Sequence, residues 1–165
     1  TLPFLPTMAP FTYGITPQGG LVPLDDQALI DAAKSMRVRP LLHLSTLTQE
    51  GTFSNELAHT VLTDGAVQNR LAASLLETIQ QKGYRRLDVD FEFIYPEDAA
   101  AYAAFIARMR ESLSPLDLPV FAALVPKTSA DQHGDLYEGH DYRLLGAAAD
   151  FVFLMTYEWG YTYHP

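Results

Sequence analysis

Short apolar runs, rich in β-branched and aromatic residues, alternate with segments of helical periodicity along the chain. Runs of this kind that end in turn residues predict strands, and they cover residues 8–15, 39–45, 86–94, 119–125 and 151–157. Apolar positions that recur every three or four residues predict helices, which cover residues 25–36, 64–81, 96–113 and 141–149. The polar segment between residues 45 and 64 is predicted to be a loop.

Single residues mark several of the predicted helix ends. Asp25 or Asp26 can cap the first helix through a side-chain oxygen, and Gly83 suits the position just after the second helix, where a left-handed backbone is common. Pro96 suits the first turn of the third helix, because its missing N–H has no helical partner there. These signals agree with the hydrophobic periodicity.

The alternation of strands and helices predicts an α/β fold with a parallel sheet covered by helices. No glycine-rich phosphate loop follows any predicted strand, which disfavours a nucleotide-binding sheet. The strands end instead in polar or aromatic residues, as expected where the active sites of barrels gather. A complete (β/α)₈ barrel needs roughly 250 residues. We therefore expect a partial TIM barrel, in which residues 1–165 are a fragment of a single barrel domain.

Three carboxylates alternate along the third predicted strand. Asp88, Asp90 and Glu92 share one face of an extended strand, while Val89, Phe91 and Phe93 share the other face. The apolar face is expected to pack under the helices, which directs the carboxylates into the barrel. Burial and nearby negative charge favour the protonated form of a carboxyl group. Glu92 lies nearest the carboxyl end of the strand, so it is the candidate general acid.

Two other interpretations of this strand remain open at this stage. The carboxylates could form a solvent-facing surface, but the neighbouring strands are apolar on both faces. They could also bind a hard metal ion, because Mg²⁺ and Ca²⁺ prefer oxygen ligands. No metal-binding loop pattern lies nearby, so we expect neither a metal nor another cofactor.

Composition narrows the set of partners. The formal charge of −9 disfavours nucleic acid and anionic membranes. The hydrophobic residues lie in short runs that cannot span a bilayer, so no membrane insertion is expected. The absence of cysteine excludes disulfides and thiolate metal sites. No targeting signal is recognised, so the sequence leaves the compartment undetermined.

Two motifs resemble those of the chitinase-like glycoside hydrolase family 18. The run Asp88–Glu92 is similar to the D-x-D-x-E motif on the fourth barrel strand of that family, and Met155–Glu158 is similar to its M-x-Y-D element on the sixth. Phe11–Ile15 and Met155–Tyr161 resemble the spore-cortex-lytic and spore-germination branch. The resemblance spans barrel strands two to six. Departures are Arg85 and Arg86 before the first motif, and Glu158 in place of the usual aspartate.

This resemblance implies retaining hydrolysis of a β-linked N-acetylhexosaminide, with the substrate's own acetamido group as nucleophile. Glu92 would protonate the leaving oxygen, Asp90 would orient the acetamido group, and Asp88 would orient Asp90. Tyr157 would donate a hydrogen bond to the acetamido oxygen, and Glu158 would contact the sugar. The implied substrate is a polysaccharide or peptidoglycan that contains N-acetylglucosamine.

Other aromatic and histidine residues receive separate interpretations. Tyr13 either lines the sugar site or belongs to the core, and Trp159 is a candidate for stacking on a sugar ring. His43 is predicted to be a hydrogen-bonded residue of the barrel interior, whereas His133 and His140 are predicted to be solvated.

Alternative functions are a chitinase that acts on chitooligosaccharides and a noncatalytic, lectin-like barrel. By resemblance, the protein would act in the cell envelope, in the spore or after secretion. An open barrel exposes unpaired strand edges, so the isolated chain is expected to self-associate.

Overall fold

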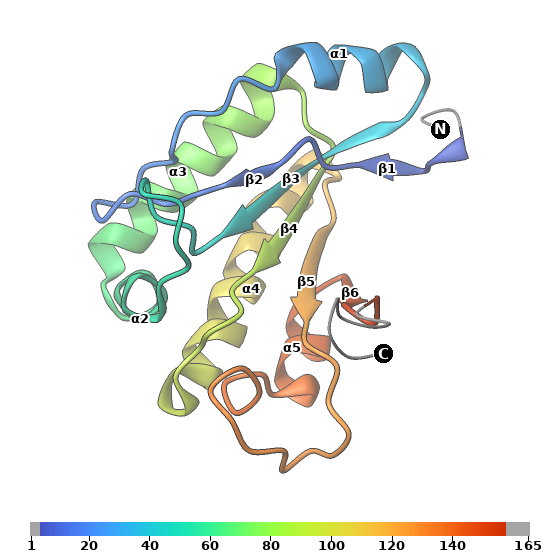
Figure 1. The fold of residues 1–165 in the computed structure, drawn as a ribbon. Helices are drawn as coiled ribbons and strands as arrows, with labels where there is room; N and C mark the ends of the chain where they lie inside the picture. Colours follow the sequence, from blue (N-terminus) through green and yellow to red (C-terminus); the bar gives the residue numbers. More distant parts are fainter. Residues whose placement is uncertain (1–3, 158–165) are drawn as a thin grey trace.

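Parallel strands form one curled sheet in the computed structural model, which describes residues 4–157 (Figure 1). The strand order is β1-β3-β4-β5-β6, and β2 also pairs with β3. The strands are β1 (Thr7–Met8), β2 (Thr12–Tyr13), β3 (Arg39–Ser45), β4 (Arg86–Asp90), β5 (Val120–Leu124) and β6 (Phe151–Leu154). From β3 to β6, neighbouring strands in the sheet follow one another along the chain, as expected for part of a barrel.

The first predicted strand is broken into two. Both pieces pair with β3, at Thr7 opposite Arg39 and at Thr12 opposite His43. The chain therefore advances five residues while β3 advances four, which leaves one extra residue between the pieces. Pro10 lies in this interruption, where its missing N–H costs no ladder hydrogen bond.

The helices cover the convex side of the sheet (Figure 1). They are α1 (Gln27–Ser35), α2 (Asn55–Thr63), α3 (Gly65–Lys82), α4 (Ala99–Leu113) and α5 (Tyr142–Ala148), with short 3₁₀ turns η2 (Pro96–Asp98) and η3 (Ser114–Leu116). Gly83 ends α3 with a left-handed backbone at φ 77°, as predicted from the glycine at this position. The Asp64 carboxylate caps α3 by accepting the backbone N–H groups of Ala66 and Val67.

Helix α2 was not predicted, because its segment was interpreted as a polar loop. Its polar residues face outward, while Leu57, Ala58, Val61 and Leu62 are buried. The Ser54 hydroxyl caps it by accepting the N–H of Leu57 at 3.1 Å. The helix is only nine residues long, so its amphipathic pattern was too short to stand out.

The core lies between the sheet and the helices. From the sheet it includes Leu42, Leu44, Leu87, Val89, Val120, Ala122 and Leu124, and Phe91 joins it from just beyond the end of β4. From the helices it includes Ile30, Leu71, Leu75, Ile79, Tyr102, Phe105, Ile106 and Leu145. Alternate positions of β3, β4 and β5 supply this core, so the intervening residues point to the concave side.

A buried carboxylate ties the start of α1 to the end of α3. Asp26 accepts hydrogen bonds from Tyr13 Oη at 2.7 Å, from Lys82 Nζ at 2.5 Å and from Tyr84 Oη. Burial raises the pKa of Asp26, but the hydrogen bonds from Lys82, Tyr84 and Tyr13 outweigh it and lower the pKa overall. The carboxylate is occupied by this network, and it does not cap α1 through its side chain as predicted.

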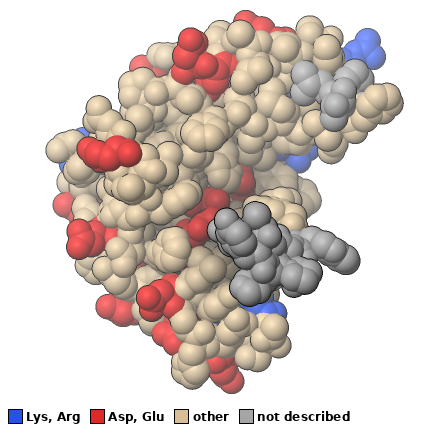
Figure 2. All heavy atoms as spheres, viewed as in Figure 1, with Lys and Arg blue, Asp and Glu red and all other residues tan. Residues whose placement is uncertain are grey.

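The sheet is open on its concave side. Acidic atoms lie in the hollow of the face drawn in Figure 2. At the edge formed by β6, Phe151, Val152, Phe153 and Leu154 are all exposed. Among the described residues, no helix has the length and apolar character needed to cross a membrane.

Candidate active site

Strand β4 directs two carboxylates toward the concave side of the sheet. Asp88 and Asp90 are each 7% exposed, whereas the alternate residues Leu87 and Val89 are part of the helix-side core. The parallel register sets Asp88 opposite His43 and Asp90 opposite Ser45. The predicted inward direction of the two aspartates is therefore confirmed.

His43 lies between these two aspartates. Its Nδ1 is 2.8 Å from Asp88 Oδ2, and its Nε2 is 3.4 Å from Asp90 Oδ2. Burial alone lowers the pKa of His43, but the hydrogen bonds and charges of Asp88 and Asp90 raise it to about 9. The ring is therefore an imidazolium at neutral pH. The predicted role of His43 as a hydrogen-bonded interior residue is confirmed, and its contact with both aspartates is an addition to it.

The remaining oxygens of the pair have a different environment. Asp88 Oδ1 and Asp90 Oδ1 are buried and have no hydrogen-bond partner among residues 4–157. A carboxylate oxygen in this state is a strong acceptor for an N–H or O–H group. No group of three His, Cys, Asp or Glu side chains within the described part of the chain has an arrangement that could hold a metal ion.

Glu92 lies in the loop after β4. The strand ends at Asp90, two residues earlier than Glu92, and the prediction of one strand through residue 94 was wrong. Phe91 is fully buried as predicted, with its ring stacked on Tyr102 and Phe105 at centroid distances of 5.5 and 5.6 Å. Phe93 is 38% exposed, so it does not pack under the helices. Glu92 itself is half-buried.

Side chains from α4 and from the segment before α5 hold this loop. The Tyr102 hydroxyl of α4 donates to the Val89 carbonyl at 3.2 Å and accepts the Phe91 N–H at 3.4 Å. His140 Nε2 is 3.0 Å from the carbonyl oxygens of both Phe91 and Glu92. His140 is fully buried, so its predicted solvation was wrong, whereas His133 is exposed as predicted. The polar sequence around the two histidines is similar and gave no signal that separates them.

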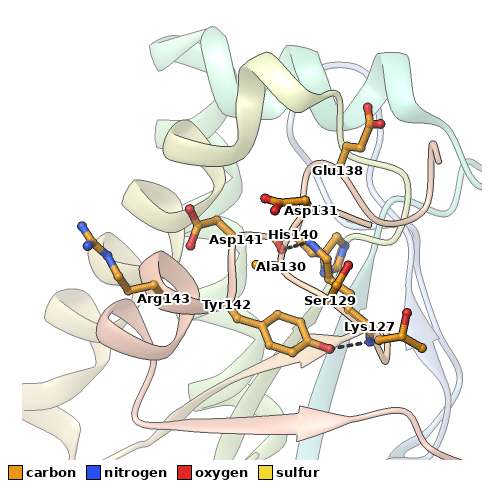
Figure 3. A pocket seen from close by; sticks show the side chains of 10 residues that line it. Lys127, Ser129, Ala130, Asp131, Glu138, His140, Asp141, Tyr142 and Arg143 are labelled. Carbon is orange, nitrogen blue, oxygen red and sulfur yellow. Dashed lines mark hydrogen bonds between the residues drawn. The ribbon is translucent and has the colours of Figure 1, made fainter. Parts of the chain in front are cut away.

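A pocket of about 680 Å³ opens beside His140 (Figure 3). The residues that line it are Lys127, Thr128, Ser129, Ala130, Asp131, Glu138, His140, Asp141, Tyr142 and Arg143. The Lys127 N–H donates to the Tyr142 hydroxyl at 3.0 Å, and Lys127 Nζ donates to the carbonyls of Tyr137 and His140 at 3.1 Å each. Lys127 thus holds the backbone of Tyr137 and His140 at the wall of the pocket.

The remaining candidate residues divide between the core and the sheet edge. Tyr13 belongs to the helix-side core and donates a hydrogen bond to Asp26. Of the two roles considered for Tyr13, it therefore has the core role and does not line the hollow. Met155 packs with Ala123 and Val125, and Tyr157 is 63% exposed beyond the end of β6. Glu158 and Trp159 lie outside the described residues.

Comparisons with known proteins agree with this geometry. The model of the family described as Glycosyl hydrolases family 18 matches residues 34–163. The cortical fragment-lytic enzyme of Bacillus subtilis (strain 168) is 37% identical over 165 residues, which are 99% of this chain and 38% of that protein. A putative sporulation-specific glycosylase, YdhD, of the same organism is 29% identical over 158 residues, 95% of this chain and 37% of that protein. The chain thus spans less than two fifths of the length of these relatives.

Solved structures give the same result for the fold. The spore cortex-lytic enzyme SleL of Bacillus cereus has a TM-score of 0.90 and 34% identity, over 97% of this chain and 37% of that one. A chitinase of Chromobacterium violaceum has a TM-score of 0.85 and 25% identity, over 94% of this chain and 50% of that one. These similarities confirm the predicted partial TIM barrel. With a family match that covers most of its length, the chain belongs to glycoside hydrolase family 18.

Proposed function

We propose that this chain supplies the acid and the acetamido-binding aspartate of an enzyme that hydrolyses β-linked N-acetylhexosaminide bonds in spore-cortex peptidoglycan. One observation carries the proposal: Asp88 and Asp90 lie buried on the concave side of β4, and the half-buried Glu92 follows Asp90 by two residues, in the loop after the strand. The relatives named as cortical fragment-lytic enzymes support the choice of glycan.

The proposed reaction is retaining and uses the substrate's own acetamido group. Glu92 donates its proton to the leaving glycosidic oxygen while the acetamido oxygen attacks the anomeric carbon. A water molecule then attacks the same carbon, and Glu92 removes its proton. The protein therefore needs no nucleophile of its own, which fits a site with two buried aspartates on β4 and one carboxylic acid in the loop after it.

The two aspartates and His43 would each contribute to stabilising the intermediate. His43 Nδ1 is hydrogen-bonded to Asp88 Oδ2 and its Nε2 lies 3.4 Å from Asp90 Oδ2, so the protonated ring holds both aspartates in place. Asp90 Oδ1, which has no partner among the described residues, is the acceptor for the acetamido N–H. A charge held in this position stabilises the positive charge that develops on the intermediate.

Residues near the end of β6 complete the proposed site. Tyr157 donates a hydrogen bond to the acetamido oxygen, Glu158 contacts the sugar, and Trp159 stacks on a sugar ring. Hydrolysis of chitooligosaccharides is the second candidate function, and the similarity to the Chromobacterium violaceum chitinase favours it. A lectin-like role is less favoured, because Glu92 retains the acid that a binding protein does not need.

The test uses the full-length protein with cortical peptidoglycan fragments and chitooligosaccharides side by side. We expect cleavage of the cortex fragments with retention of the β configuration, read by NMR of the first product formed. Glu92→Gln should lower kcat by about 10²–10⁴-fold. Glu97→Gln is the matched control, because Glu97 is an exposed acid only five residues further along the chain, in the 3₁₀ turn η2.

Two results would overturn parts of this proposal. Turnover of chitooligosaccharides without turnover of cortex fragments would replace the substrate. Wild-type activity of Glu92→Gln would remove Glu92 from the role of acid.

A further inference from the structure

The backbone at Phe91 and Glu92 leaves the sheet without ladder partners. Strand β5 pairs with β4 only as far as Val89 opposite Ala122. The carbonyls of Phe91 and Glu92 lie beyond this point, and buried carbonyls require hydrogen-bond donors. His140 Nε2 lies 3.0 Å from both oxygens and takes the place of the missing strand. Glu92 O also accepts the N–H of Ile94 at 3.2 Å.

The state of the His140 ring agrees with this role. A histidine that donates through Nε2 to carbonyls is either neutral with its proton on Nε2 or doubly protonated. Burial lowers the pKa of His140 more than the two carbonyls raise it, so the neutral form dominates near pH 7. Nδ1 is buried without a hydrogen-bond partner in the described part of the chain, which disfavours a second proton there. The ring is thus a fixed donor to the loop.

The segment around His140 is itself rigidly held. The His140 N–H donates to the Tyr137 carbonyl at 3.0 Å, and its carbonyl accepts from Lys127 Nζ at 3.1 Å. The Tyr102 ring and the imidazole are in edge-to-face contact at a centroid distance of 5.9 Å. These contacts fix the ring at the wall of the pocket described above (Figure 3).

Gly139 adds a second contact between the same two loops. A Cβ atom at this position would overlap the carbonyl oxygen and the Cβ of Ile94. Ile94 is buried and lies two residues after Glu92, so it has little freedom to move away. Only glycine lets the two loops approach this closely.

We propose that His140 is a positioning residue, which holds the backbone of Glu92 so that its carboxyl group meets the leaving oxygen. The inference rests on the proposed role of Glu92 as general acid. His140 acts on the reaction only through that backbone. A shift of about 1 Å at a reacting group can cost about 10²-fold in rate, so a donor at this point has a measurable effect on kcat.

Two amide substitutions in the full-length protein separate the donor from the packing. In His140→Gln the amide nitrogen reaches about as far as Nε2, whereas in His140→Asn it reaches only about as far as Nδ1. Both variants are polar and uncharged, so they differ in reach alone. We expect His140→Asn to lower kcat about 10–100-fold with little change in KM, and His140→Gln to stay within about threefold of wild type.

Leaving-group dependence distinguishes positioning from general damage. A dinitrophenyl glycoside needs little protonation, while a sugar leaving group depends on the acid. We expect His140→Asn to lose much more activity on the sugar leaving group than on the dinitrophenyl group. Gly139→Ala should show the same selectivity, because it displaces the same loop by overlap. His133→Asn is the control, since this histidine lies in the same loop and is exposed.

The outcomes separate the inference from the proposal on which it rests. Equal losses on both substrates in His140→Asn, or equal activities of the Asn and Gln variants, would overturn the positioning role. If Glu92→Gln itself shows no selectivity for the leaving group, then the role of Glu92 fails first. If His140→Asn does not fold, Gly139→Ala decides in its place, and its loss must be selective for the inference to stand.

Discussion

The contact of His43 with two carboxylates makes the stability of the fold depend on pH. The ring binds its proton with a pKa of about 9 in the folded protein, against 6.5 for a free histidine. The folded state therefore holds more protons than the unfolded state between these two values, and stability falls as the pH rises through them. The contribution is complete below about pH 6.5 and is lost above about pH 9.

The size of the effect follows from the shift. Each unit of pKa corresponds to about 1.4 kcal/mol, so the imidazolium contributes roughly 3 kcal/mol at low pH. The side chain is 24% exposed, which limits screening by solvent. In His43→Gln the two aspartates keep a hydrogen-bond donor but lose the positive charge. The stability difference between wild type and variant should shrink by roughly 3 kcal/mol from about pH 6 to about pH 10.

Urea unfolding of the full-length protein measures this difference, with tyrosine and tryptophan fluorescence as the probe. Wild type and His43→Gln are compared at several pH values, and His133→Gln provides a control histidine that is exposed. A difference between wild type and His43→Gln that stays constant from about pH 6 to about pH 10 would refute the reasoning. It would mean that the ring is not held as a cation between the aspartates.

Three further outcomes are expected. On a dinitrophenyl glycoside, whose leaving group needs little protonation, Glu92→Gln should recover much of its glycosylation rate. Asp90→Asn should not recover, because in this variant the acetamido group loses its charge partner. Equal recovery of both variants would contradict the assigned roles. Asp26→Asn should lower the free energy of unfolding, measured by urea titration, by roughly 3 kcal/mol, since it leaves Lys82 without its buried counterion. Asp25→Asn is the control and should change this free energy little, because Asp25 is exposed. The isolated 165-residue chain should self-associate through the exposed β6 edge (Phe151–Leu154), and light scattering that gives a monomer at every concentration would count against this.

The fold was predictable because its signals are local. Five apolar runs, each followed by a helical pattern or a turn, gave the order of the parallel sheet, and the two-residue period gave the inward direction of Asp88 and Asp90. Gly83 marked the end of a helix, because the left-handed backbone required there favours glycine. Helix α2 was missed because nine residues give too little periodicity against a polar background.

The site was less predictable, because its contacts join residues far apart in the sequence. The end of β4 at Asp90 depends on where β5 diverges and on Tyr102 from α4, neither of which can be inferred from residues 86–94 alone. The burial of His140 depends on the approach of Gly139 to Ile94. Asp26 has the sequence context of a helix cap, yet two tyrosines and a lysine from other elements occupy its carboxylate.

The hydrogen bond from His140 to Glu92 spans 48 positions and joins two consecutive strand-helix units. During synthesis the loop of Glu92 leaves the ribosome well before residue 140, so its final geometry cannot form until the next unit has been made and has docked. The same link constrains enzyme engineering. A chimera that exchanges residues 126–140 with a relative would also change the support of the acid, so residues 91–95 need to be exchanged together with them.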